Sequence, residues 1–174
     1  MKFFIAALLT GFPLFASAQN PIAIPDTLSG TSILLRLHAD STAFINGTKT
    51  FTNAFNSYSY LGPTLILNKG DFVSLTVENQ LMDTSTVHWH GLHVPAVADG
   101  GPHTVILPNT SWLAQFTVKN NAATYWYHPH LHMRTGEQAM RGAAGLIIVR
   151  DSVESTLNLP RTYGVDDFPI IVQT

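Results

Sequence analysis

Alternation of apolar and polar residues constrains the fold of this chain more than any other feature. It is clearest in residues 72–79, where Val73, Leu75 and Val77 alternate with polar side chains. Because side chains of a strand point alternately to its two faces, this period of two predicts a strand with one buried face. Turn signals such as Asn46-Gly47 separate similar short segments along the chain. The other predicted strands cover residues 32–39, 43–45, 49–51, 64–67, 87–92, 113–118, 123–127 and 145–149.

Short strands at this spacing predict an all-β fold, either a sandwich or a Greek-key β-barrel. Residues 135–144 alone hint at a helix, and the glycines within them weaken that prediction. The chain has no cysteine, so the apolar core must stabilise the fold without disulfides. The formal net charge of −2 is small and its charges are scattered, which gives no sign of a nucleic-acid partner.

The N-terminal residues have the three parts of a secretory signal peptide. Met1-Lys2 is positively charged, Phe3 to Leu14 is apolar, and Ala16-Ser17-Ala18 is an A-x-A cleavage site. We therefore expect a signal peptide over residues 1–18 and an exported mature chain, periplasmic or secreted. The apolar run is too short for a membrane span, so no membrane attachment is expected after cleavage. The alternative is an ordinary buried segment at the N-terminus.

Two His-x-His pairs, His88-Trp89-His90 and His128-Pro129-His130, lie at predicted strand ends. Residues two apart in a strand share a face, so His88 and His90 should point one way and Trp89 the other. The second pair can do the same if the strand continues past Pro129, although proline is confined to edges and strand ends. We call each of the two His-x-His pairs, 88/90 and 128/130, a histidine fork. Four imidazoles arranged in two such forks suit Cu, Zn, Fe or Ni as metal ligands. The alternative is that the histidines are ordinary surface or core residues.

The C-terminal residues resemble a passage between two domains. Residues 151–161 are polar, lack aromatic residues and end at Leu159-Pro160, which predicts a linker. Residues 167–174 then resemble a fresh strand. We therefore expect one domain over 19–150, followed over 151–174 by a linker and the first strand of a truncated second domain.

Six segments of the chain form a set of motifs, in this order: Leu61-Gly62-Pro63-Thr64, Asn68-Lys69-Gly70-Asp71, His88-Trp89-His90-Gly91-Leu92, Asp99-Gly100-Gly101-Pro102, Trp126-Tyr127-His128-Pro129-His130 and Gly142-Ala143-Ala144-Gly145-Leu146-Ile147-Ile148. Together they resemble the N-terminal cupredoxin domain of the multicopper oxidases, above all the bacterial copper-efflux, copper-resistance and laccase-like enzymes. The likeness covers nearly all of the mature chain, so we expect residues 19–150 to form a cupredoxin-like domain.

The resemblance implies copper as the cofactor, in a trinuclear cluster that reduces O2 to water. It makes His88 a ligand of the type 2 copper, and His90, His128 and His130 ligands of the type 3 pair. Asp99 matches an acidic residue that would relay protons to bound oxygen; the alternative is a turn residue before two glycines. We do not expect the remaining histidines and two methionines to be primary ligands: His38, His93, His103, His132, Met133 and Met140.

The chain departs from the family in two respects. It lacks the C-terminal histidine motifs, and it has no cysteine for a type 1 copper. We therefore expect this chain alone to be inactive as an oxidase. It would need further cupredoxin domains, of the same protein or of another chain, as well as O2 and a reducing substrate. The alternatives are a stand-alone exported copper carrier and a non-catalytic cupredoxin scaffold.

Overall fold

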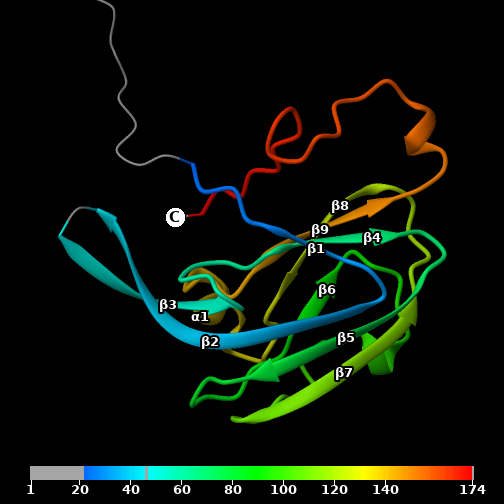
Figure 1. Cartoon of the computed structure of the whole chain (residues 1–174). Helices are drawn as coiled ribbons and strands as arrows, with labels where there is room; N and C mark the ends of the chain where they lie inside the picture. The colour runs from blue at the N-terminus through cyan, green and yellow to red at the C-terminus, as the bar shows by residue number, and fades with distance from the viewer. Residues whose placement is uncertain (1–21, 46, 174) are drawn as a thin grey trace, which may run out of the picture.

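The computed structural model describes residues 22–45 and 47–173, which form two mixed β-sheets (Figure 1). The first sheet has five strands in the order β1 (Thr27–Ser29), β4 (Thr64–Asn68), β9 (Gly145–Arg150), β8 (Ala123–His128) and β6 (His88–His90). The second has four, in the order β3 (Thr48–Phe55), β2 (Ser32–Ile45), β5 (Phe72–Asn79) and β7 (Thr110–Thr117). Two short helices connect strands, η1 (Ala96–Ala98) and α1 (Thr135–Met140), and a third, η2 (Glu154–Thr156), follows β9.

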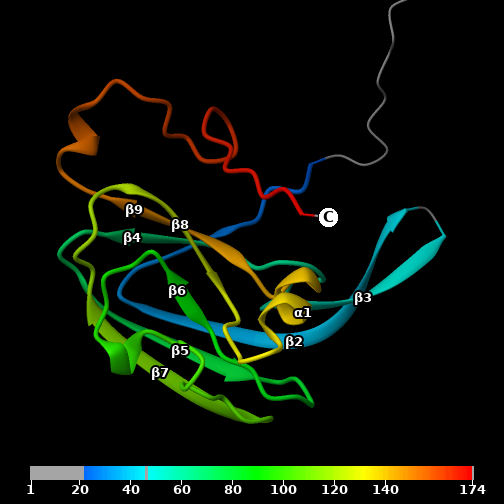
Figure 2. The ribbon, with the colours of Figure 1, turned by 180° about the vertical axis from the view of Figure 1, so that it is seen from behind.

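The sheets enclose one apolar core, and Figure 2 shows the same two layers from behind. The alternation in β5 behaves as predicted, because Val73, Leu75 and Val77 are all buried in this core. Leu65 of β4 and Ile147 of β9 belong to the same core from the opposite sheet. The predicted all-β sandwich is therefore confirmed. No helix among the described residues is long and apolar enough to cross a membrane.

Strand β2 pairs with two neighbouring strands, one along each half of its length. Residues 32–37 pair in parallel with β5, whereas residues from Leu37 onward pair antiparallel with β3. The second half of β2 and its partner β3 form a hairpin that projects beyond the sandwich (Figure 1). The strand is longer than the predicted 32–39, because β3 continues to provide a hydrogen-bonding partner as far as the pair Ile45↔Thr48. Asn46 of the predicted turn and the predicted signal peptide lie outside the described residues.

Two sequence predictions need correction. The strand expected over residues 87–92 is limited to His88–His90, because Gly91 turns the chain with a φ of 86°. The strand expected from Asp167 onward is not formed in the described residues, where only an isolated bridge joins Tyr163 and Asp167.

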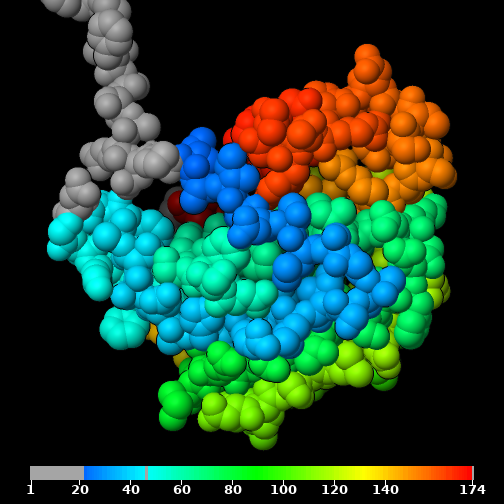
Figure 3. All heavy atoms as spheres, in the orientation of Figure 1, coloured from blue at the N-terminus to red at the C-terminus, as the bar shows by residue number. Residues whose placement is uncertain are grey.

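The residues after Asp167 lie beside the N-terminal residues without pairing with them as a strand. Ile22, Ala23 and Pro25 line a shared pocket with Pro169, Ile170 and Ile171. Proline cannot donate to a ladder, and both of these neighbouring segments contain one. Side-chain contacts hold the C-terminal residues instead, including an ion pair between Arg150 and Asp167 at 3.1 Å. The space-filling view shows this segment lying against the N-terminal one (Figure 3).

We expect the substitution Gly145→Ala to destabilise the fold by about 1–3 kcal/mol, the usual cost of overpacking a core. A Cβ at Gly145 would overlap the hydroxyl and ring of Tyr127, which is fully buried and donates a hydrogen bond to the Pro63 carbonyl at 2.8 Å. The matched control is Gly136→Ala in α1, where a Cβ would enter open space. Urea unfolding of both variants checks this, and equal stability of the two would contradict the packing described.

Candidate metal centre

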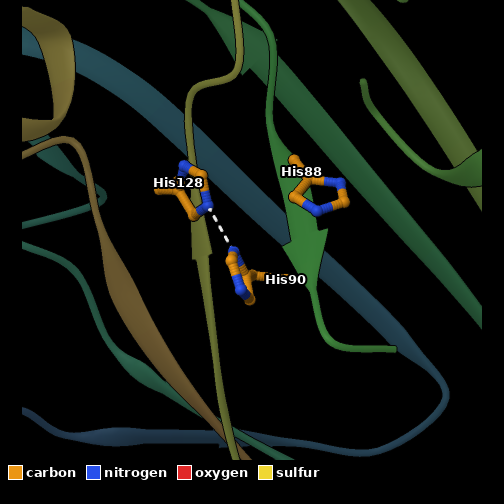
Figure 4. A group of neighbouring side chains, drawn as sticks. All are labelled: His88, His90 and His128. Carbon is orange, nitrogen blue, oxygen red and sulfur yellow. Dashed lines mark hydrogen bonds between the residues drawn. The ribbon is translucent and has the colours of Figure 1, made fainter. Parts of the chain in front are cut away.

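His88 and His90 of β6 lie beside His128 of β8, on adjacent antiparallel strands (Figure 4). In the β6–β8 register His88 is opposite His128, and His90 is opposite Trp126. Trp89 points into the core and is 0% exposed. His88 and His90 therefore share the other face of β6, as the alternation predicted, with ring centroids 5.7 Å apart.

Nitrogen atoms from three of the four predicted ligands converge. The candidate donor atoms of His88, His90 and His128 all lie within 4.8 Å of one another. Nδ1 of His90 and Nε2 of His128 are hydrogen-bonded to each other at 3.1 Å. Two imidazole nitrogens bound to one tetrahedral ion, with bonds of about 2 Å, would be about 3.3 Å apart. The spacing of this pair is therefore already that of two ligands of one ion.

The fourth histidine, His130, is held differently. Strand β8 ends at His128, so the alternation does not continue through Pro129 as the sequence prediction required. Even so, the chain turns the His130 ring to 5.3 Å from the ring of His88, centroid to centroid. The backbone N–H of His130 donates to Oγ1 of Thr86 at 2.6 Å. His130 thus lies beside the group of three but outside it.

Backbone carbonyls fix the orientation of two imidazoles. Nδ1 of His88 lies 2.9 Å from the Asp99 carbonyl oxygen, and Nδ1 of His128 lies 2.8 Å from that of Pro129. A carbonyl oxygen can only accept, so each Nδ1 is the donor. The proton of each neutral ring is thereby placed on Nδ1, and the lone pair of each Nε2 is left for a metal. Metal-binding histidines are typically held in this way.

Asp99 lies next to the first fork. Its Oδ2 is 3.3 Å from Nδ1 of His88, and its side chain is 36% exposed. Gly100 allows this approach, because it has a φ of 71° and a Cβ there would overlap the carbonyl oxygen of Val87. Asp99 also ends the short helix η1. Asp99 is therefore a partly exposed carboxylate beside His88, and its position is also that of a turn residue.

Burial of the His128 ring lowers its pKa. This residue is 4% exposed, and burial is the largest of the effects that lower its pKa from 6.5 to about 4. The positive charge that a protonated His128 would carry is opposed further by His88, His90 and His130, while the hydrogen bond to Pro129 acts in the other direction. At neutral pH the ring is therefore uncharged, which is the form that binds metals.

Sequence reasoning missed three residues that support the forks. The indole of Trp126 stacks on the His128 ring at 3.8 Å between centroids, and Thr86 holds His130. Each precedes a fork by two residues, so strand parity could have placed both on the histidine face. Asn120 also supports the loop after β6, by donating to the Gly91 carbonyl oxygen at 2.9 Å. No signal in the sequence pointed to it.

The histidines that we did not expect to be ligands lie outside the convergent group. His93, His103 and His132 are exposed, and His38 is half-buried in β2. Among the described residues, none of these four belongs to the cluster of converging donor atoms. Met133 and Met140 are exposed as well.

Comparison with known proteins identifies the family. The family model described as multicopper oxidase matches residues 38–154, which include both histidine forks. The chain belongs to the multicopper oxidase family. Copper is therefore the metal that the family implies, and the histidine cluster is compatible with it.

Both enzymes and a cell-division protein are among the relatives of this multicopper oxidase domain. It is 41% identical to the multicopper oxidase mco of Staphylococcus aureus, over 91% of this chain and 36% of the relative. It is 37% identical to the cell division protein FtsP of Escherichia coli, over 97% of this chain and 37% of the relative. The chain thus spans little more than a third of the length of these relatives.

Solved structures support the same assignment of fold. The laccase-like multicopper oxidase CueO of Ochrobactrum sp. superposes with a TM-score of 0.81 at 38% identity, over 86% of this chain and 34% of that one. A multicopper oxidase of Pediococcus acidilactici gives a TM-score of 0.81 at 34% identity, over 88% of this chain and 34% of that one. The predicted cupredoxin type of fold is therefore confirmed.

We expect the His128 ring to titrate near pH 4 in the metal-free chain. In the unfolded chain a histidine titrates near ~6.5, so between these pH values only the unfolded state binds this proton. The free energy of unfolding should therefore fall as the pH decreases through this range, and the His128→Gln variant should lose that part of the slope. NMR titration of the His128 Cε1–H and urea unfolding from pH 7 to 4.5 test this. A midpoint near ~6.5, with equal slopes in both proteins, would contradict it.

Proposed function

We propose that this chain is the copper-binding N-terminal part of a multicopper oxidase. In this proposal His88, His90, His128 and His130 hold part of a trinuclear copper cluster at which O2 is reduced to water. The single observation that carries the proposal is the 3.1 Å separation between Nδ1 of His90 and Nε2 of His128. In the metal-free chain Nδ1 of His90 donates a hydrogen bond to the Nε2 lone pair of His128 across the neighbouring strands. The two nitrogens therefore already have the spacing of ligands to one ion, and an ion would take the place of the shared proton.

The donor set fits copper. All the converging atoms are imidazole nitrogens, which suit copper and other late first-row ions better than Mg²⁺ or Ca²⁺. The low pKa of His128 keeps one donor uncharged, and the bonds to Asp99 and Pro129 aim two Nε2 lone pairs away from the backbone. By family resemblance, His88 would bind the type 2 copper and the other three histidines the type 3 pair.

When bound, copper would supply the one-electron redox chemistry on which the reduction of O2 depends. The residues of this chain would hold and orient the ligands and exclude water beneath them, where Trp89 and Tyr127 fill the core. The Asp99 carboxylate, half-exposed and 3.3 Å from Nδ1 of His88, is suited to carry protons between solvent and the cluster. Further cupredoxin domains and a reducing substrate would supply the remaining ligands and the electrons.

We also propose that the chain is exported, to the periplasm or beyond the cell. The three-part signal pattern of residues 1–18 supports this.

The similarity to FtsP favours a second candidate, a cupredoxin scaffold without copper chemistry. Two features of this chain support the oxidase instead: all four histidines are present, and three of them converge. A stand-alone copper carrier is the third candidate, and it shares the copper site with the oxidase. Copper binding therefore separates the scaffold from the other two.

We expect replacement of His88 and His90 by alanine to weaken Cu(II) binding by at least about 100-fold. Loss of a residue that only hydrogen-bonds to a metal ligand typically weakens binding by about 10–100-fold, and loss of two ligands should cost more. The fold should persist, because both side chains lie on the face of β6 opposite the core residue Trp89. The matched control, His38→Ala with His103→Ala, should bind copper as the parent does. Isothermal titration of the three proteins at pH 7 measures this.

Two outcomes of this titration would count against the proposal. Equal affinity in all three proteins would show that the forks are not the site. No specific binding by the parent would favour the scaffold.

A further inference from the structure

Gln138 is a buried amide that neither the family resemblance nor the histidine motifs explain. It lies in α1, only eight positions after His130, and is 2% exposed. Burying a primary amide costs free energy unless both its donor and its acceptor find partners. A leucine or methionine would fill the same space without that cost, so the amide group itself needs a structural reason.

Both ends of the amide bind one short segment of the chain. Nε2 of Gln138 donates to the Thr84 carbonyl oxygen at 2.8 Å, and Oε1 accepts from the Ser85 hydroxyl at 2.8 Å. The Thr84 carbonyl can only accept, so the orientation of the amide is fixed. Residues 84–86 lead directly into β6, which carries the first histidine fork.

The same segment holds the second fork. Thr86, next to Ser85, accepts the backbone N–H of His130 through its hydroxyl at 2.6 Å. His130 lies past the end of β8 and follows Pro129, so the strand ladder gives it no support. Ser85 also bridges Ile106 on its other side, which anchors the segment to the sandwich. A continuous set of bonds thus runs from Gln138 through residues 84–86 to His130.

We propose that Gln138 is a positioning residue that keeps the two histidine forks in register by clamping residues 84–86 between α1 and His130. This inference rests on the proposed copper-binding function and adds a residue to that site. Without the clamp, residues 84–86 would keep the bridge to Ile106 but lose their hydrogen bonds to α1. Thr86, whose hydroxyl accepts the one hydrogen bond that the described structure gives to the His130 N–H, would then be held on one side only. The position of His130 relative to His88 would then vary.

The test compares Gln138→Met with a control variant that removes a different interaction between α1 and the segment before β6. Arg134, at the start of α1, forms an ion pair with Asp83 at 2.6 Å, and this pair is largely exposed. Exposed ion pairs contribute little to the stability of a fold. We therefore expect Arg134→Gln to match the parent in amide exchange and in Cu(II) affinity. Gln138→Met keeps the volume of the side chain but removes both hydrogen bonds. Ser85→Ala, which removes one bond, is a milder variant in case Gln138→Met folds poorly.

Two readouts are needed, amide hydrogen exchange without metal and Cu(II) affinity. We expect the His130 amide to exchange at least about 10-fold faster in Gln138→Met, relative to the Leu75 amide in the core strand β5, and Cu(II) affinity to fall about 10–100-fold. A purely structural role would accelerate both amides together and leave the affinity of the folded protein unchanged. Thr86→Val, which cuts the bond to His130 directly, should reproduce the exchange effect.

The outcomes separate this inference from the proposed function. If the parent binds copper specifically but Gln138→Met matches Arg134→Gln in both readouts, the positioning role is overturned. If the parent does not bind copper, the proposed function fails, and the exchange of the His130 amide still decides whether Gln138 holds that residue in place.

Discussion

The antiparallel pairing of β6 with β8 is the constraint on which the site depends. It sets His88 opposite His128 and brings Nδ1 of His90 to within 3.1 Å of Nε2 of His128. A slip of one residue would turn Trp89 outward and the histidines into the core. The burial of Trp89, together with its indole bond to the Ala98 carbonyl at 2.9 Å, therefore specifies the register and thereby the metal site.

The chain holds this pair of strands by different means at each end. At the first fork Gly100 lets the loop that follows η1 approach the backbone at Val87, which brings the carbonyl and carboxylate of Asp99 to His88. At the second fork the strand ends before Pro129, so no ladder hydrogen bond supports His130. A side chain supports it instead, because the hydroxyl of Thr86 accepts a hydrogen bond from the His130 N–H. The first fork is thus fixed by backbone packing and the second by a polar network.

Local periodicity was sufficient for much of this structure. The alternation in β5 and the parity of His88 and His90 gave the correct faces, because a strand imposes a period of two whatever surrounds it. The helix expected over residues 135–144 is limited to Thr135–Met140, and the apolar run after Asp167 forms no strand in the described residues. Strand formation depends on a partner, which a local pattern cannot supply. The clamp formed by Gln138 joins residues more than fifty positions apart, so no local pattern could reveal it.

The most direct test of the central claim is a crystal structure of the copper-loaded chain with anomalous scattering measured at the copper absorption edge. We expect an anomalous peak between Nδ1 of His90 and Nε2 of His128, about 2 Å from each nitrogen. Copper bound only at the exposed His93, His103 or His132, with no peak between the forks, would contradict it.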